Sequence, residues 1–141
     1  MARAVELSDD PAMTDHARDT LTAFVGAFGS GDLDALAALL SHDFVGHVTT
    51  ADGNVRAVDR DGYVASVRAM DVLSANLRLE VPNVVEIEAG RILAMVEVHA
   101  DRHGRTLHNF SGQLATVRDG TISELWMVDA LPEESDRFWA P

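Results

Sequence analysis

The sequence predicts an α+β domain in which three helices pack on one face of a curved, mainly antiparallel sheet. Three observations support this prediction. Apolar residues recur at helical spacing near the amino end and again around Tyr63. From Leu77 onward they alternate with polar residues, as they do in half-buried strands. Glycine-containing turns at Ala89-Gly90, His103-Gly104 and Asp119-Gly120 then divide this second part into strands.

Two helices and a short strand are expected first. Residues 14–28 have the apolar spacing of an amphipathic helix, and Gly29 and Gly31 end it. Asp32 is placed to cap a second, shorter helix, and residues 44–48 follow as a short strand. The chain therefore enters the sheet only after two helices.

A third helix precedes the main run of strands. Asp59 or Asp61 can cap it, and Tyr63 and Val67 lie on its apolar side. Pro82 indicates a bulge or break in the strand that comes next, because proline cannot donate to a sheet ladder. The strands are expected near residues 77–88, 91–101, 105–117 and 121–129.

Composition limits both the architecture and the partners. With 141 residues, we expect a flexible tail over residues 1–13 and a single domain over residues 14–141. Eleven Lys and Arg against 23 Asp and Glu give a net charge of -12, so we expect neither nucleic acid nor a membrane as a partner. The chain has no cysteine and no signal-peptide pattern, so a cytoplasmic protein is expected.

Strand parity sorts the side chains of the predicted sheet into two faces. A two-residue turn at His103-Gly104 would pair Arg102 with Arg105. One face then carries Ala94, Val96, Val98, Leu107, Asn109, Ser111, Gln113 and Ala115. The opposite face carries Met95, Glu97, His99, His108, Phe110 and Leu114.

Two segments, Phe24 to Leu36 and Gly112 to Trp126, resemble the SnoaL-like branch of the NTF2-like superfamily. The resemblance implies a cone, formed by a sheet curled around helices, with a pocket for a small apolar organic ligand. It also implies a homodimer that buries the face opposite the pocket. No cofactor is implied. The Gly29-Ser30-Gly31 turn lacks the preceding strand that a dinucleotide site requires.

The resemblance also bears on the last turn. A three-residue turn over residues 118–120 would place Leu125, Met127 and Asp129 on the face of Gln113, whereas a two-residue turn would place Glu124, Trp126 and Val128 there. Ketosteroid isomerase presents its last-strand pocket residues at the offsets of the first set. We therefore expect the three-residue turn, with Asp129 near the rim of the pocket.

The catalytic sets of two known relatives are missing. Relative to ketosteroid isomerase, Val48 stands where the base should be and Phe24 where a tyrosine donor should be, while Gln113 replaces a protonated aspartate but keeps a donor. Relative to limonene epoxide hydrolase, Ala94, Val96 and Met127 replace its arginine and two aspartates. Neither activity is expected in its established form.

The remaining candidates indicate proton transfer next to a carbonyl, by an isomerase or cyclase. His47 or Asp129 would move the proton and Gln113 would polarise the oxygen. The segment before His47 resembles a Trp-His segment of SnoaL-like chains, with Gly46 in place of Trp, although parity turns His47 away from the pocket unless a bulge re-aims it. The expected ligand-binding residues are Phe24, Val48, Tyr63, Val96, Asn109, Ser111 and Met127.

Two alternatives stay open. A non-catalytic pocket, or a dimerising scaffold, would also explain the lost catalytic residues. Separately, Glu97, His99 and His108 share the outer face and could be neighbours, as a divalent metal requires. Because homodimers of the superfamily bury that face, we expect a subunit-contact network there and no metal.

Overall fold

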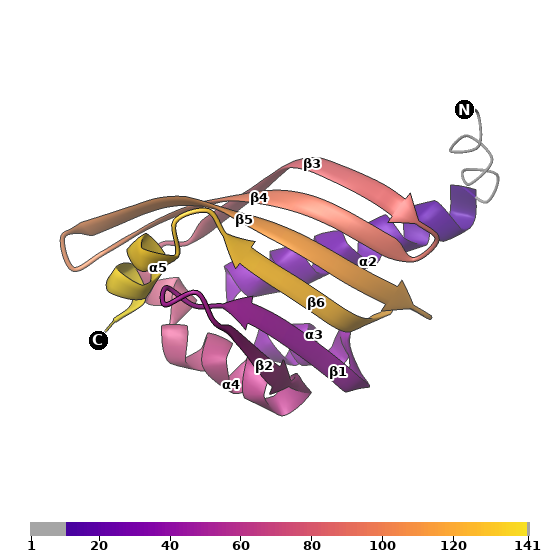
Figure 1. Cartoon of the computed structure of the whole chain (residues 1–141), viewed down its shortest axis with the longest axis horizontal. Helices are drawn as coiled ribbons and strands as arrows, with labels where there is room; N and C mark the ends of the chain where they lie inside the picture. Colours follow the sequence, from indigo (N-terminus) through magenta and orange to yellow (C-terminus); the bar gives the residue numbers. More distant parts are fainter. Residues whose placement is uncertain (1–10, 141) are drawn as a thin grey trace.

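The computed structural model describes residues 11–140 and places four helices against a six-stranded sheet (Figure 1). Along the sheet the strands lie in the order β2-β1-β6-β5-β4-β3, with β1 and β6 parallel and every other pair antiparallel. The elements are α2 (Pro11–Ser30), α3 (Leu33–Ala38), β1 (Leu40–Thr49), β2 (Val55–Asp59), α4 (Arg60–Met70), η1 (Val72–Ala75), β3 (Arg78–Glu88), β4 (Arg91–Arg102), β5 (Arg105–Arg118), β6 (Thr121–Asp129) and α5 (Pro132–Trp139).

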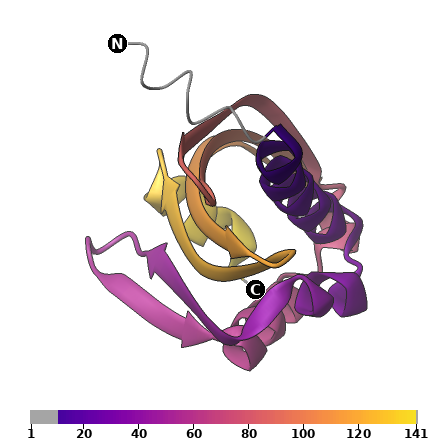
Figure 2. The ribbon, with the colours of Figure 1, turned by 90° about the vertical axis from the view of Figure 1, so that its right-hand side faces the viewer.

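The sheet is strongly curved. Figure 2 shows β3, β4, β5 and β6 curling into a partial barrel, with α2 covering its open side. The α5 helix lies at the end of the barrel where β6 finishes (Figure 1). The predicted cone of helices on a curved, mainly antiparallel sheet is confirmed. No helix of the described residues is long and apolar enough to cross a membrane.

The helix boundaries follow from capping. The α2 helix begins at Pro11, before the expected residue 14, because proline is well suited to the first position of a helix while the apolar periodicity starts later. Residues 1–10 of the expected tail lie outside the described residues. Asp32 caps α3 by accepting a hydrogen bond from the Ala35 amide at 3.1 Å. Asp59, rather than Asp61, caps α4, with the Gly62 amide as donor at 2.8 Å.

Three elements were not predicted. The β2 strand is an edge strand with four of its five residues exposed, so it has no apolar alternation to detect. The η1 turn is a single short 3-10 segment. The α5 helix begins at Pro132, beyond the last strand that the sequence predicts, and buries Phe138 against Ala75, Ala100 and Leu107.

The first hairpin turn is as predicted. Arg102 pairs with Arg105, and both turn residues have positive φ, 55° at His103 and 74° at Gly104. This conformation is typical of a tight turn joining twisted strands. The inner face therefore carries Ala94, Val96, Asn109, Ser111 and Gln113, all of them buried.

The second turn differs from the expected three-residue form. Arg118 pairs with Thr121, so Asp119-Gly120 is a two-residue turn. A β-bulge then follows, because Val117 pairs with Ile122 and Thr116 with Glu124, leaving Ser123 without a partner in the ladder. The extra residue restores the parity, and the predicted placement of Leu125, Met127 and Asp129 on the face of Gln113 is confirmed.

Candidate functional site

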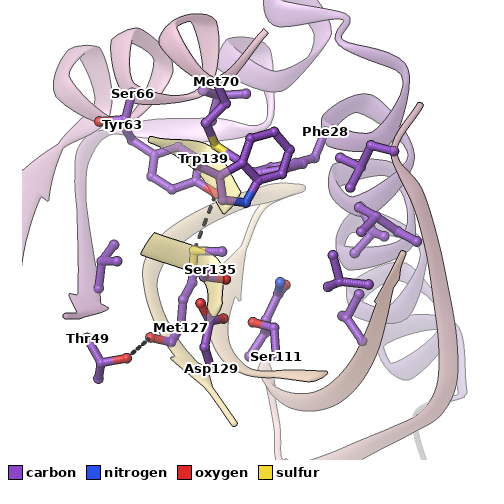
Figure 3. Close-up of a pocket in the computed structure, with 18 of the residues that line it drawn as sticks. Phe28, Thr49, Tyr63, Ser66, Met70, Ser111, Met127, Asp129, Ser135 and Trp139 are labelled. Carbon is purple, nitrogen blue, oxygen red and sulfur yellow. Dashed lines mark hydrogen bonds between the residues drawn. The ribbon is translucent and has the colours of Figure 1, made fainter. Parts of the chain in front are cut away.

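A cavity of about 410 Å³ lies between the inner face of the sheet and the helices (Figure 3). Most of its wall is apolar, as in typical small-molecule sites. Phe24 and Phe28 of α2, Val67 and Met70 of α4, and Leu79 of β3 form much of that wall. The predicted site residues that line the cavity are Phe24, Val48, Tyr63, Val96, Ser111, Gln113, Met127 and Asp129.

His47 lies outside the cavity, on the outer face of the sheet. It pairs with Trp126 across β1 and β6 without a bulge, and the two rings stack with their centroids 4.0 Å apart. Its Nε2 lies 2.9 Å from Glu124 Oε2. The geometry therefore does not support His47 as a base in the cavity.

Gly46, the neighbour of His47, lies on the opposite, inner side of β1 and leaves room there for an aromatic ring. A Cβ added at Gly46 would lie 3.1 Å from the Phe44 ring and 3.2 Å from Val58 Cγ2. The Phe44 ring, which is buried, thus takes the space that a larger side chain at position 46 would need.

Asn109 is buried but does not line the cavity, because its amide is already occupied by the chain. Its Nδ2 donates to the Leu131 carbonyl at 2.9 Å and to Ser135 Oγ at 3.2 Å. Its Oδ1 accepts from the Leu131 amide at 3.0 Å and from the Phe110 amide at 2.9 Å. Asn109 therefore holds the segment that leads into α5.

The polar part of the cavity wall retains unused hydrogen-bonding capacity. Among the described residues, neither Gln113 Oε1 nor Ser111 Oγ has a hydrogen-bond partner, although both atoms are buried. The Tyr63 hydroxyl donates only to Met127 Sδ, at 3.4 Å (Figure 3). Thioether sulfur is a weak acceptor, so a ligand oxygen would be a better partner for this hydroxyl.

The cavity environment destabilises the charged form of the Asp129 carboxyl group. Burial raises the pKa of Asp129, the charge of Asp136 adds to this effect, and the adjacent hydroxyls of Ser135 and Ser111 oppose it. Burial, together with the Asp129 charge, also raises the pKa of Tyr63, so its phenol stays protonated as a donor. A carboxyl group with a raised pKa and a protonated phenol thus face one apolar space.

Sequence reasoning missed the contribution of α5 and β2. Ser135 and Trp139 of α5 line the cavity (Figure 3). Its lining also includes Asp136 of α5, Ala140 after it, and Arg56 of β2. The Phe138-Trp139 pair was the available signal. Phe138 packs on the domain core while Trp139 lines the cavity, and the Arg102 guanidinium lies 5.8 Å and 5.4 Å from the two ring centroids.

Gln113 offers a test of whether its amide serves a ligand. Because Oε1 is buried without a partner, Gln113→Leu should leave the free energy of unfolding unchanged or raise it by about 1 kcal/mol. The same variant should lose most of its affinity for 2-naphthol, an apolar phenol whose oxygen needs a partner. Urea unfolding and fluorescence titration measure the two effects. A destabilised variant that still binds 2-naphthol would make Gln113 structural.

The comparisons with known proteins agree with this fold. A family model of the SnoaL-like domain matches residues 21–125, and the chain therefore belongs to the SnoaL-like domain family. This confirms the resemblance found in the sequence. A comparison with curated proteins finds no significant match.

Solved structures of similar fold cover most of the chain. Bal32a, from a soil-derived mobile gene cassette, is 17% identical, with 89% of this chain and 98% of that chain covered and a TM-score of 0.74. IdmH, a candidate polyketide cyclase from Streptomyces antibioticus, is 22% identical, with 81% and 91% covered and a TM-score of 0.69. A candidate polyketide cyclase from Xanthomonas campestris is 23% identical, with 89% and 98% covered and a TM-score of 0.66. At these identities the likeness shows a shared fold.

Proposed function

We propose that this chain is a cytoplasmic protein that binds a small apolar carbonyl compound in the cavity and moves a proton next to the carbonyl. One observation carries the proposal: Asp129, with its raised pKa, shares an apolar cavity with Tyr63 and with the unpartnered amide oxygen of Gln113. The naming of similar structures as candidate polyketide cyclases supports the same reaction class.

Each group has a defined role in this reaction. Asp129 takes a proton from the carbon next to the carbonyl, and the electron pair of that bond moves onto the carbonyl oxygen to form an enolate. Tyr63 and the Gln113 amide donate hydrogen bonds to the oxygen, after the amide turns its NH₂ toward the ligand. The Asp129 carboxyl then returns the proton to another carbon, which gives isomerisation. Alternatively, the enolate carbon attacks a second carbonyl of the same molecule. The oxygen of that carbonyl takes the electron pair and then the proton held on Asp129, which gives ring closure.

A model ketone, 2-tetralone, tests the proposed proton transfer. In D₂O, deuterium replaces the protons next to the carbonyl of 2-tetralone, and the protein should accelerate this exchange. Proton NMR measures the exchange rate. The same protein should bind 2-naphthol, which mimics the enolate. Binding of 2-naphthol without faster exchange would instead support the non-catalytic pocket. If the protein neither binds 2-naphthol nor accelerates the exchange, both functions are contradicted.

We also propose that two copies associate through the outer face of the sheet. Its strands β4, β5 and β6 expose a group of large apolar side chains, namely Leu93, Met95, Phe110 and Val128. A face of this kind is typical of a subunit interface.

The dimer is expected to depend on Phe110. Sedimentation velocity at micromolar concentration should show a dimer for the natural chain. Phe110→Asp should shift it to a monomer, because a charge would be buried at the interface. Leu73→Asp is the control, because Leu73 is exposed and lies on η1, outside the sheet. A monomeric natural chain would contradict the proposal.

A further inference from the structure

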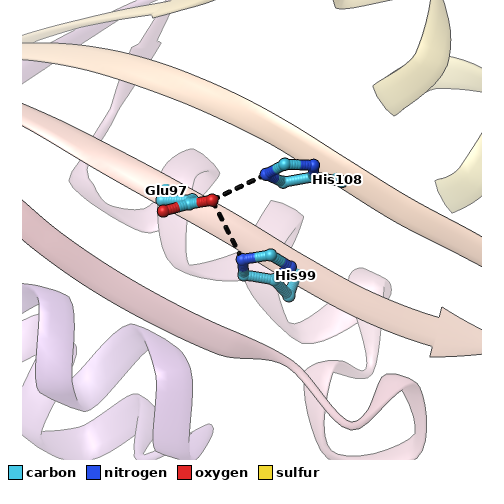
Figure 4. Close-up of side chains that lie close together, drawn as sticks. All are labelled: Glu97, His99 and His108. Carbon is cyan, nitrogen blue, oxygen red and sulfur yellow. Dashed lines mark hydrogen bonds and ion pairs between the residues drawn. The ribbon is translucent and has the colours of Figure 1, made fainter.

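The outer face also carries a compact group of metal-binding side chains. Glu97 and His99 are two residues apart on β4 and point to the same side, and His108 lies directly opposite His99 on β5 (Figure 4). Within the part of the chain that the structure describes, these three are the one such group whose ligand atoms all lie within 4.8 Å of one another. Two rigid, fully paired strands therefore fix the position of all three side chains.

The distances are close to those of a metal site. His108 Nε2 lies 2.6 Å and His99 Nε2 lies 3.2 Å from the same oxygen, Glu97 Oε2. The two imidazole rings stack with centroids 4.5 Å apart and an interplanar angle of 11°. In a tetrahedral zinc site, bonds of about 2.0–2.1 Å place neighbouring ligand atoms about 3.3 Å apart. Small rotations of the half-buried Glu97 and His99 and the exposed His108 side chains would therefore bring the three atoms to that spacing.

The surroundings favour a cation. Glu80 lies opposite Glu97 on β3, and its Oε2 is 4.0 Å from His99 Nε2, so it can supply a fourth ligand. The positive charge of Arg78, opposite His99, is paired with another carboxylate, since its guanidinium lies 3.8 Å from Asp101 Oδ2. The net charge of -12 adds a long-range attraction for cations.

We propose that Glu97, His99 and His108 bind a divalent metal of the zinc class, with Glu80 or water in the fourth position. Two imidazole nitrogens and one carboxylate oxygen suit zinc and its neighbours better than calcium or magnesium, which prefer oxygen ligands. This proposal reverses the interpretation from the sequence, in which the three residues formed a subunit contact only. It is independent of the cavity on the other face, and it places the metal within the proposed subunit interface, because Phe110 lies opposite Glu97.

The chain contains its own control for this site. His47 and Glu124 also lie on the outer face, with Nε2 and Oε2 2.9 Å apart, so they match the His108-Glu97 pair in chemistry. Among the described residues, however, His47 and Glu124 belong to no group of three potential metal ligands. If three ligands are needed, metal binding should depend on His99 and His108 and not on His47.

Titration of the metal alone tests the proposal. The EDTA-treated, dialysed protein should bind one Zn²⁺ per chain in isothermal titration calorimetry. His99→Gln and His108→Gln should each weaken this binding by at least about tenfold, whereas His47→Gln should leave it unchanged. Co²⁺ should give the visible absorption of a tetrahedral site in the natural chain and not in His99→Gln. Circular dichroism checks that every variant is folded.

Three outcomes would overturn the proposal. They are no binding at micromolar Zn²⁺, equal binding by the natural chain and the His99→Gln variant, and one metal per two chains. The last result would mean that two copies share the metal.

Discussion

Replacing Asp129 with asparagine should slow exchange of the protons next to the carbonyl of 2-tetralone by about 10²- to 10⁴-fold, the usual contribution of a positioned general base. The amide has the shape of the carboxyl group but cannot accept the proton. Binding of 2-naphthol should persist, because the apolar wall and the donors from Tyr63 and Gln113 are unchanged. NMR exchange rates and fluorescence titration measure the two effects.

Asp136 provides the matched control. It also lines the cavity and also carries a carboxyl group, but it is on α5 and is assigned no proton transfer. Asp136→Asn should leave the exchange rate within a few-fold of the natural chain. Its charge raises the pKa of Asp129, so its removal should lower that pKa slightly. Equal losses in the two variants would contradict a specific role for Asp129.

The largest loss of stability outside the apolar core is expected from Asn109→Ala. Asn109 is 2% exposed and makes four hydrogen bonds, three of them to Leu131 and Ser135. The variant leaves the Leu131 amide and carbonyl without this partner, so the free energy of unfolding should fall by about 2–4 kcal/mol. Urea unfolding measures the change.

The same variant should loosen the end of the cavity. Because Asn109 holds the start of α5, its loss should increase hydrogen exchange of the α5 amides more than that of α2. Asn83→Ala, in an exposed position of β3, should change stability by less than about 0.5 kcal/mol. An Asn109→Ala chain as stable as this control would show that the four hydrogen bonds contribute little.

The fold could be predicted because local signals agree with the global pattern. The turn glycines and the alternation in β4 and β5 determine which side chains face inward, and a two-residue turn at His103 was enough to place Gln113. The last turn shows the limit of such reasoning. The predicted three-residue length of this turn was wrong. The bulge at Ser123 nevertheless adds one residue to the strand and gives the expected parity for Met127 and Asp129.

The site was harder to predict because some of its residues come from elements without a strong periodic signal. The α5 helix has eight residues and only Phe138 buried, so the sequence could not show that Trp139 lines the cavity. Asn109 shows a second limit. Parity placed it on the inner face correctly, but only the structure shows that Leu131 and Ser135 already occupy its amide.

The pH dependence of the exchange reaction tests most directly whether Asp129 is the base. A base acts when deprotonated, so kcat/KM for 2-tetralone should rise with pH through the raised pKa of Asp129, above its ordinary value of 3.8, and then level off. The His47→Gln variant should give the same profile, because His47 lies on the outer face. A rise centred near the ordinary histidine pKa of about 6.5 that disappears in His47→Gln would contradict the account.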